Sequence, residues 1–288
     1  MSHFNKYINP KGLIHIGAHG GGEYIDYVKF NINNLIFFEP QHYWYNQLLK
    51  NQQEILSRHP NRTTDRCINA AVGNFNGSSE MYIANNGASS SILEPKVHLT
   101  QHPDVLFKSR ETVKVIRLDD FWETSDLKPE IFDTLTIDTQ GYELEVLRGA
   151  INTLEHIDVI EVEVERVELY VNSTQIDQLD KFLTEHNFQR RLVSWCGGTW
   201  GDAIYTRPKS GNITEEMIKS LDSNLVSISD NCWHLKIRNG VIIGLTLKDG
   251  SCFSQILDGG VKVVHEDLFI DYEDLFRTYK SHVVACGG

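Results

Sequence analysis

Cysteine is scarce in this sequence, which contains five cysteines among 288 residues. Their number is odd and they share no C-x-x-C spacing, so the pattern is unlike a disulfide framework or a zinc site. We therefore expect reduced, mostly buried thiols. The cysteines are Cys67, Cys196, Cys232, Cys252 and Cys286.

Basic residues are outnumbered by acidic ones, and long apolar runs are lacking. Lys and Arg number 27 against 39 Asp and Glu, which gives a formal charge of −12. A field of this sign repels polyanions, so nucleic acid is a disfavoured partner. The first residues, MSHFNKYINPKG, do not form the apolar stretch of a signal peptide, and no later run has the length of a membrane span. We expect a cytoplasmic protein.

Short apolar runs alternate with stretches of helical period over the first two thirds of the chain. This alternation predicts the α/β class, with a doubly wound parallel sheet covered by helices on both faces. We expect an antiparallel end to this sheet and an inserted hairpin within residues 73–91. The predicted strands span residues 13–18, 35–39, 67–72, 113–118, 133–138, 159–165, 188–194 and 203–206.

Helices are predicted between these strands, over residues 23–30 and 43–55 and around Ile176, Leu179 and Leu183. A further helix follows the strand at 133–138. Its apolar residues recur at spacings of three and four, which places them on one helix face. They are Leu144, Leu147, Ile151 and Leu154.

The pattern of apolar and polar residues changes near residues 207–211. We predict a domain over residues 1–208 and a small appendage over 209–288. Asn239-Gly240 and Asp249-Gly250 are strong hairpin signals between apolar runs, and the strict alternation over residues 241–247 predicts one buried strand face. The appendage is therefore predicted to be a β-meander, closed by a short helix within residues 272–281.

A glycine-dense turn follows the first predicted strand, in the segment Ile16-Gly17-Ala18-His19-Gly20-Gly21-Gly22. Glycines let the backbone approach a ligand closely, and a helix start offers free amide donors. Glu39 ends the next strand about 20 residues later, as in nucleoside-binding α/β folds, where such a carboxylate accepts the ribose hydroxyls. The alternative is a glycine turn needed only for packing and a solvated glutamate.

Acidic residues lie at the ends of two later strands. Asp138 stands at the carboxyl end of the strand at 133–138, the edge at which open α/β sheets bind ligands. Residues 160–165 alternate apolar side chains with Glu161, Glu163 and Glu165, which places the three glutamates on one face. Clustered carboxylates raise one another's pKa, which suits a general base. We consider Asp138 or Glu163 to be that base.

Other interpretations of these acids stay open. Asp138 is also suited to cap the following helix. The glutamates are also suited to pair with Arg166, Arg190 or Arg191, and a divalent metal held by Asp138 and these acids is a less favoured possibility.

The segment Ile137-Asp138-Thr139-Gln140-Gly141-Tyr142-Glu143-Leu144-Glu145-Val146-Leu147-Arg148-Gly149-Ala150 resembles the signature of the FkbM-family methyltransferases. Four further segments are similar to that family, and they occur along this chain in the same order as in the family. They are Ile16-Gly17-Ala18, Glu39-Pro40, the run at 69–73 and Arg117-Leu118-Asp119-Asp120-Phe121. The small-residue and serine segment at 87–91 is also similar. The resemblance covers roughly residues 12–207.

The resemblance implies a class I (Rossmann-like) methyltransferase fold that uses S-adenosylmethionine and methylates an oxygen of a sugar or polyketide. It assigns Gly17, Ala18 and Gly21 to the methionine part and Glu39 to the ribose. Asn69 and Ala70 would lie near the adenine, and Asp138 would border cofactor and acceptor. The cofactor-binding set is completed by His19, which is unusual in that turn, and by Gln140, which stands where many members carry Glu.

The favoured function is therefore O-methylation of a sugar, glycan or glycosylated metabolite. Alternatives are a methyltransferase of RNA or protein, and a non-catalytic protein whose appendage binds a glycan or partner. Trp195 and Trp200 flank a glycine loop and are suited either to stack on a pyranose or to pack on the core. A homodimer is possible.

Overall fold

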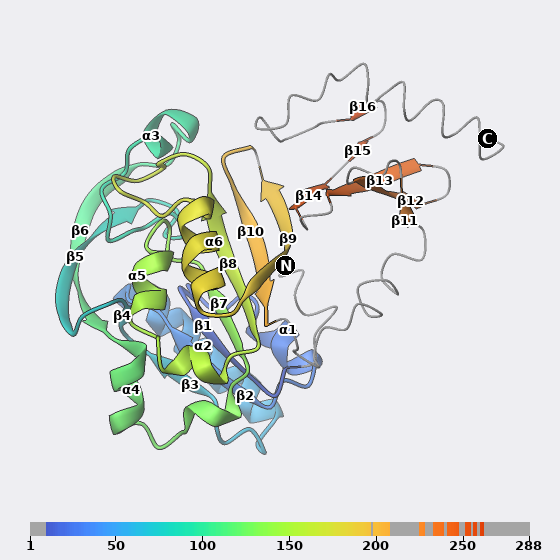
Figure 1. Cartoon of the computed structure of the whole chain (residues 1–288). Coiled ribbons are helices and arrows are strands. Elements are labelled where there is room, and N and C mark those ends of the chain that lie inside the picture. Colours follow the sequence, from blue (N-terminus) through green and yellow to red (C-terminus); the bar gives the residue numbers. More distant parts are fainter. Residues whose placement is uncertain are drawn as a thin grey trace.

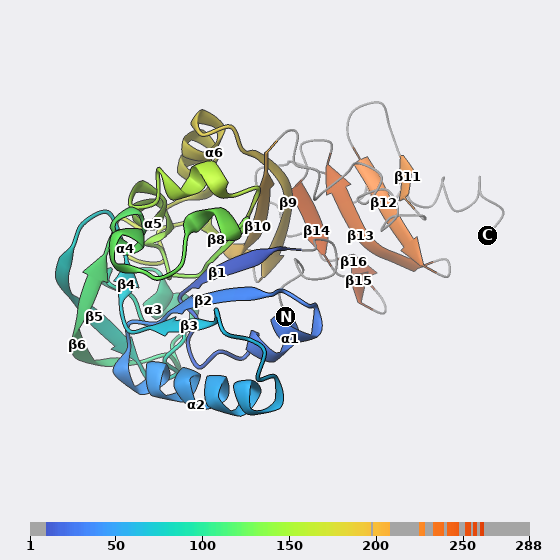
Figure 2. The ribbon, with the colours of Figure 1, turned by 90° about the horizontal axis from the view of Figure 1, so that it is seen from below.

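The computed structural model describes residues 10–196 and 198–207, and beyond them the backbone of short strands between Leu225 and Val261. A large sheet runs through the molecule, with helices on both of its faces (Figures 1 and 2). Its first strands are β1 (Gly12–Ile16), β2 (Asn34–Phe38), β3 (Arg66–Ile68), β7 (Thr134–Ile137), β8 (Val159–Glu165), β9 (Gln189–Cys196) and β10 (Trp200–Thr206). The doubly wound α/β prediction is confirmed.

The strand order in this part of the sheet is β9-β10-β8-β7-β1-β2-β3. The five strands from β8 to β3 are parallel, and β10 lies antiparallel between β8 and β9. The order reverses at β1, because the chain moves outward to β2 and β3 on one side and later to β7 on the other. Ligands of open α/β sheets bind at such a reversal, beyond the carboxyl ends of the strands.

Two apolar clusters attach helices to the faces of the sheet (Figure 2). On one face, Tyr24, Tyr27 and Leu48 pack against Phe37. Tyr24 and Tyr27 belong to α1 (Tyr24–Lys29), and Leu48 belongs to α2 (His42–Arg58). The other face is covered by α4 (Leu118–Thr124), α5 (Glu143–Arg148), α6 (Ile176–Glu185) and the 3-10 helices η2 (Pro129–Ile131) and η3 (Thr153–His156).

A single strand was predicted over residues 67–72, and this prediction is wrong. The chain forms β3 beside β2 and then leaves the large sheet for β4 (Ala71–Val72), which pairs with β6 (Phe107–Ile116). The break falls at Asn69, whose side-chain amide donates to the carbonyl oxygens of Glu39 and Pro40. The inserted strand β5 (Gly77–Ala84) pairs with β6, so β4, β6 and β5 form a small second sheet next to the short helix α3 (His98–Gln101).

The prediction of the apolar face of the helix after β7 is wrong at one residue. Leu144, Leu147 and Leu154 are buried in the core, but Ile151 is 37% exposed. The helix ends at Arg148, and the next residue, Gly149, packs on the backbone of the loop after β4. A Cβ at Gly149 would lie 1.9 Å from the carbonyl oxygen of Gly73. The chain then turns into η3, which removes Ile151 from the stripe.

Beyond Arg207, the strands β11 to β14 pair antiparallel in sequence order, as a meander requires, and β14 lies parallel to β9. These strands are β11 (Leu225–Ser227), β12 (Trp233–Arg238), β13 (Val241–Leu247) and β14 (Ser251–Ser254), followed by the pair β15 (Ile256–Leu257) and β16 (Gly260–Val261). The predicted helix within 272–281 lies outside the described residues, and the division at residue 208 stays a prediction. In the part of the chain that is described, no helix is long and apolar enough to cross a membrane.

Candidate active site

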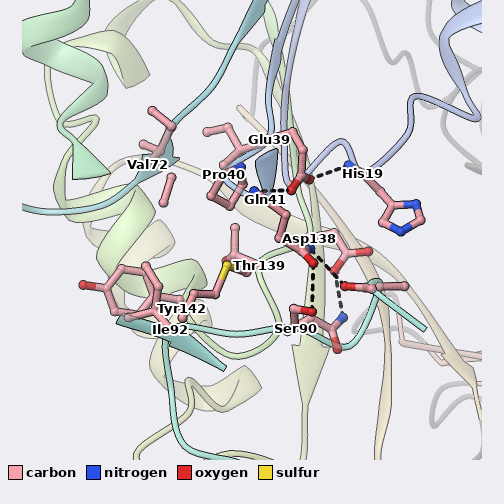
Figure 3. Close-up of a pocket in the computed structure, with 18 residues that line it drawn as sticks. His19, Glu39, Pro40, Gln41, Val72, Ser90, Ile92, Asp138, Thr139 and Tyr142 are labelled. Atoms are coloured by element: carbon pink, nitrogen blue, oxygen red, sulfur yellow. Dashed lines mark hydrogen bonds between the residues drawn. The ribbon is translucent and has the colours of Figure 1, made fainter. Parts of the chain in front are cut away.

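A pocket lies at the carboxyl ends of β1, β2 and β7, where the strand order reverses (Figure 3). The space between its lining residues is about 610 Å³, including the open solvent at its mouth. Its lining combines the strand ends with the small sheet and the loop that follows β5. The lining residues are Ile16, Gly17, His19, Glu39, Pro40, Gln41, Ala70, Ala71, Val72, Met81, Gly87, Ala88, Ser90, Ile92, Asp138, Thr139, Gln140 and Tyr142.

The glycine turn after β1 forms one wall of the pocket. The amides of Gly17 and Ala18 both donate to the carbonyl oxygen of Phe38, at 3.0 Å. Gly17 has a φ of 85°, and a Cβ there would lie 1.7 Å from the carbonyl oxygen of Asp138. Only glycine therefore lets the chain after β1 approach the chain after β7 this closely.

Glu39 is anchored by main-chain amides beside this turn. One carboxylate oxygen accepts from the amide of His19 at 2.8 Å and the other from the amide of Gln41 at 2.7 Å. Burial raises the pKa of Glu39 to about 7, while the two amide donors act in the opposite direction. Each oxygen retains lone-pair capacity for a hydroxyl donor in the pocket.

The opposite wall contains two carboxyl groups that are joined by one amide. Nε2 of Gln140 donates to Oδ1 of Asp138 at 2.9 Å and to Oε2 of Glu163 at 2.8 Å. Asp138 lies deep in the molecule but is exposed to the pocket, whereas Glu163 is buried. Burial raises the pKa of both groups, and the charge of Asp138 raises that of Glu163 further. A raised pKa suits a carboxylate that must accept a proton.

The turn that carries Gln140 is stabilised by Glu143. One of its carboxylate oxygens accepts from the amides of Thr139 and Gly141 and from the hydroxyl of Thr139, at 2.9 to 3.1 Å. Gln140 itself has a φ of 56° and Gly141 a φ of 94°. Burial and the nearby Glu165 raise the pKa of Glu143 to about 8. Glu143, rather than Asp138, therefore holds the start of α5.

The serine loop, residues 87–91, covers the pocket and contacts both walls. Gln41 donates to the carbonyl oxygen of Gly87 at 3.0 Å, and Ser90 donates to the side chain of Gln41 at 3.1 Å. On the other side, Ser91 donates to the carbonyl oxygen of Gln140 at 2.8 Å. The loop is thus tied to the end of β2 and to the turn after β7.

Of the predicted site residues, six line the pocket: Gly17, His19, Glu39, Ala70, Asp138 and Gln140. Ala18, Gly21 and Asn69 are not among the lining residues, and Glu163 contacts the lining through Gln140. The assignment of each residue to a part of the cofactor stays a prediction.

Several of the alternative interpretations of the sequence can be compared with the structure. Arg190 lies 3.5 Å from Asp180, Arg191 donates to Thr206, and Arg166 stacks on Trp195 at 3.8 Å from the ring centre. Trp195 is buried in the core, and neither it nor Trp200 lines the pocket. Within the described residues, no cluster of three or more His, Cys, Asp or Glu has the arrangement of a metal site.

Sequence reasoning missed three residues of the site. Gln41 ties β2 to the serine loop, and Trp44 stacks on His19 with ring centres 3.5 Å apart. Tyr170 donates to Oε1 of Gln140 at 2.9 Å from a loop 30 residues later. The position of Gln41, directly after the acid-proline pair, was a usable signal, whereas Tyr170 lies in an irregular segment with none.

Comparison with known proteins gives the family. Residues 15–190 match the family described as the methyltransferase FkbM domain. The chain belongs to the FkbM methyltransferases. Its methyl donor is accordingly S-adenosylmethionine. A curated relative, 2-O-methyltransferase NoeI of Sinorhizobium fredii, is 31% identical over 112 residues, which are 36% of this chain and 45% of that protein. The chain thus matches less than half the length of that relative.

Solved structures of other methyltransferases resemble this chain more distantly. The FkbM methyltransferase of Methylobacillus flagellatus KT is 16% identical, with a TM-score of 0.44, over 68% of this chain and 43% of that one. TrmK of M. capricolum, in complex with S-adenosyl-homocysteine, is 14% identical with a TM-score of 0.38, over 75% of this chain and 71% of that one.

The pocket of this FkbM methyltransferase fits the chemistry of S-adenosylmethionine, which carries a sulfonium cation, a ribose and an adenine. The described lining includes the acids Glu39 and Asp138 but no lysine or arginine, so it suits a cation and not the pyrophosphate of a dinucleotide. The carboxylate of Glu39 suits ribose hydroxyls. Apolar side chains such as Val72, Met81 and Ile92 suit an adenine face. When bound, the cofactor supplies an electrophilic methyl group.

Proposed function

We propose that this FkbM methyltransferase methylates a hydroxyl group of a sugar, glycan or glycosylated metabolite. The observation that carries the proposal is the pair of carboxyl groups of Asp138 and Glu163, which Gln140 holds together at the pocket wall. A hydroxyl is a weak nucleophile, and a positioned base that takes its proton assists the transfer. The relative named as a 2-O-methyltransferase supports oxygen as the accepting atom.

Some residues of the site would position the cofactor, and others would accept the proton of the acceptor hydroxyl. The turn at Gly17, Ala18 and Gly21 would face the methionine part, and Glu39 would accept the ribose hydroxyls. Asn69 and Ala70 would border the adenine. Methyl transfer from sulfur to oxygen is an in-line displacement, so alignment supplies much of the acceleration. Asp138 or Glu163 would accept the hydroxyl proton as the new carbon–oxygen bond forms.

The charge of the pocket supports a neutral acceptor. The described lining contains no lysine or arginine, and the whole chain carries a formal charge of −12. An RNA substrate needs lysines and arginines along its phosphates. A sugar hydroxyl needs hydrogen-bond partners, which Asp138 and Ser90 offer at one pocket.

Transfer of a labelled methyl group tests the proposal directly. The protein is incubated with methyl-labelled S-adenosylmethionine and a panel of free sugars, oligosaccharides and glycosylated metabolites, with transfer RNA and a protein extract in parallel. We expect label in one class of carbohydrate, and transfer by the Asp138→Asn protein that is slower by about 10²- to 10⁴-fold. Label in RNA that declines steeply with salt would instead favour the nucleic-acid alternative. Absence of cofactor binding by calorimetry would defeat both.

A further inference from the structure

Both the nitrogen and the oxygen of the Gln140 side-chain amide have hydrogen-bond partners. Its nitrogen donates to Asp138 at 2.9 Å and to Glu163 at 2.8 Å, while its oxygen accepts from the hydroxyl of Tyr170 at 2.9 Å. Donors that point at carboxylate oxygens favour the ionised form of a carboxyl group. Gln140 therefore opposes the tendency of burial to neutralise this pair.

The oxygen of this amide contacts Tyr170, while its nitrogen contacts the two acids. Tyr170 is fully buried, and its hydroxyl is held between Oε1 of Gln140 and the carbonyl oxygen of Ser89, at 2.9 and 2.8 Å. The main-chain carbonyl oxygen of Gln140 accepts from Ser91 at 2.8 Å, which holds the backbone of this turn. A flipped amide would place its oxygen against the oxygens of two carboxyl groups, which is unfavourable while the pair carries a negative charge. With the pair ionised, the network therefore favours the orientation with both N–H bonds toward the acids.

Further charged groups face the pair from every neighbouring element, and most of them are acidic. Burial lowers the pKa of His15 and of His19, so both are neutral at pH 7. None of the described groups is a lysine or an arginine. The groups are His15, His19, Glu23, Glu39, Glu143, Glu165, Tyr170 and Asp202.

We propose that Gln140 is a positioning residue whose amide keeps one negative charge on the Asp138–Glu163 pair while the sulfonium is present. The proposal rests on the proposed function only for the role of the pair as base. In the transfer, the sulfur–methyl bond breaks with its electrons remaining on sulfur. The acceptor oxygen forms the new bond and its proton passes to the pair. A cation and an anion thus become a neutral thioether and a neutral acid pair.

The attraction between the negative charge of the pair and the sulfonium can be measured without an acceptor. S-adenosylmethionine carries the sulfonium, whereas S-adenosylhomocysteine does not. Calorimetry gives the affinity of both ligands between pH 5.5 and 9. In the unchanged protein, we expect the ratio of the two affinities to shift toward S-adenosylmethionine as pH rises through the titration of the pair. In Gln140→Met, which keeps the side-chain length but lacks the donors, the midpoint should move up by about one pH unit.

Two further variants separate this role from a structural one. Tyr170→Phe leaves Gln140 in place but frees its amide to flip, so it should shift the midpoint in the same direction. Gln53→Met, on the exposed surface of α2, should behave like the unchanged protein. If Gln140→Met does not fold, Tyr170→Phe decides the question.

The proposal is overturned if the two affinities fall by the same factor at every pH in the variants, because Gln140 would then only support the serine loop. A protein that discriminates the two ligands as expected but methylates no sugar would defeat the proposed function and leave this inference intact.

Discussion

The two walls of the pocket are built by different means. On the β1–β2 wall, main-chain amides hold the turn and the carboxylate. Those of Gly17 and Ala18 bind the carbonyl oxygen of Phe38, and those of His19 and Gln41 bind Glu39. On the β7–β8 wall, side chains bind side chains, with Gln140 between Asp138 and Glu163.

This difference predicts different responses to substitution. A wall built from backbone depends on the absence of side chains at its closest approaches, and changes there should affect folding and ligand binding together. A wall built from side chains depends on the donor or acceptor at each position, and changes there should alter the rate and its pH dependence. The following substitutions test this division in order of decreasing effect.

Gly17→Ala should have the largest effect. The added Cβ would lie 1.7 Å from the carbonyl oxygen of Asp138, at a φ of 85°, so the two walls must separate. We expect no measurable binding of S-adenosylmethionine by calorimetry and a loss of about 3 kcal/mol or more in the free energy of unfolding. Gly22→Ala is the matched control, because a Cβ at Gly22 meets nothing within 4 Å. Equal behaviour of the two variants would show that the close approach is not required.

Asp138→Asn should leave the fold intact but slow methyl transfer by about 10²- to 10⁴-fold. The amide keeps the shape of the side chain but is no longer a base. Affinity for S-adenosylhomocysteine, which carries no sulfonium charge, should change little. Asp177→Asn, at the exposed start of α6, is the matched control. Full activity of the Asp138→Asn protein would assign the base to Glu163 or dispense with one.

Parts of both walls were predicted from local signals in the sequence. The strand at residues 159–165 was predicted with its observed bounds, because alternation of apolar and acidic residues is a local signal. The glycine turn, Glu39 and Asp138 were predicted in the same way, since each lies at a recognisable strand end.

The sequence could not predict the contacts that cross between distant segments. The tie from Tyr170 to Gln140 depends on a left-handed turn and on a loop 30 residues away. Residues 67–72 have continuous strand propensity, yet the chain breaks at Asn69 because its amide caps the end of β2. Ile151 keeps the helical spacing, but the helix ends at Arg148, where the chain packs closely on the loop after β4 through Gly149. Packing between segments overrides local pattern in each case.

Glu39→Gln should change how stability depends on pH, because Glu39 is 3% exposed and its pKa rises from 4.5 to about 7. Between these values the folded protein binds more protons than the unfolded chain at this group, so its contribution to stability decreases as pH rises. Between pH 4.5 and 8, chemical denaturation without ligand should show the unchanged protein losing about 1–3 kcal/mol relative to Glu39→Gln. Glu54→Gln, exposed on α2, should show no such difference. Parallel pH profiles would mean that the two amides already offset the burial of this carboxylate.

The smallest effects should come from the serine loop, where two neighbouring hydroxyls contact opposite walls. Ser90→Ala removes the donor to Gln41 on the β2 side, and Ser91→Ala removes the donor to the carbonyl oxygen of Gln140 on the β7 side. Each loss should weaken cofactor affinity by about 2- to 10-fold. Ser90→Ala should weaken S-adenosylmethionine and S-adenosylhomocysteine equally, because the bond from Ser90 to Gln41 is not part of the network that orients the Asp138–Glu163 pair. Ser91→Ala should weaken S-adenosylmethionine more, because it loosens the turn that orients the carboxyl pair, and the reverse order would contradict the division between the walls.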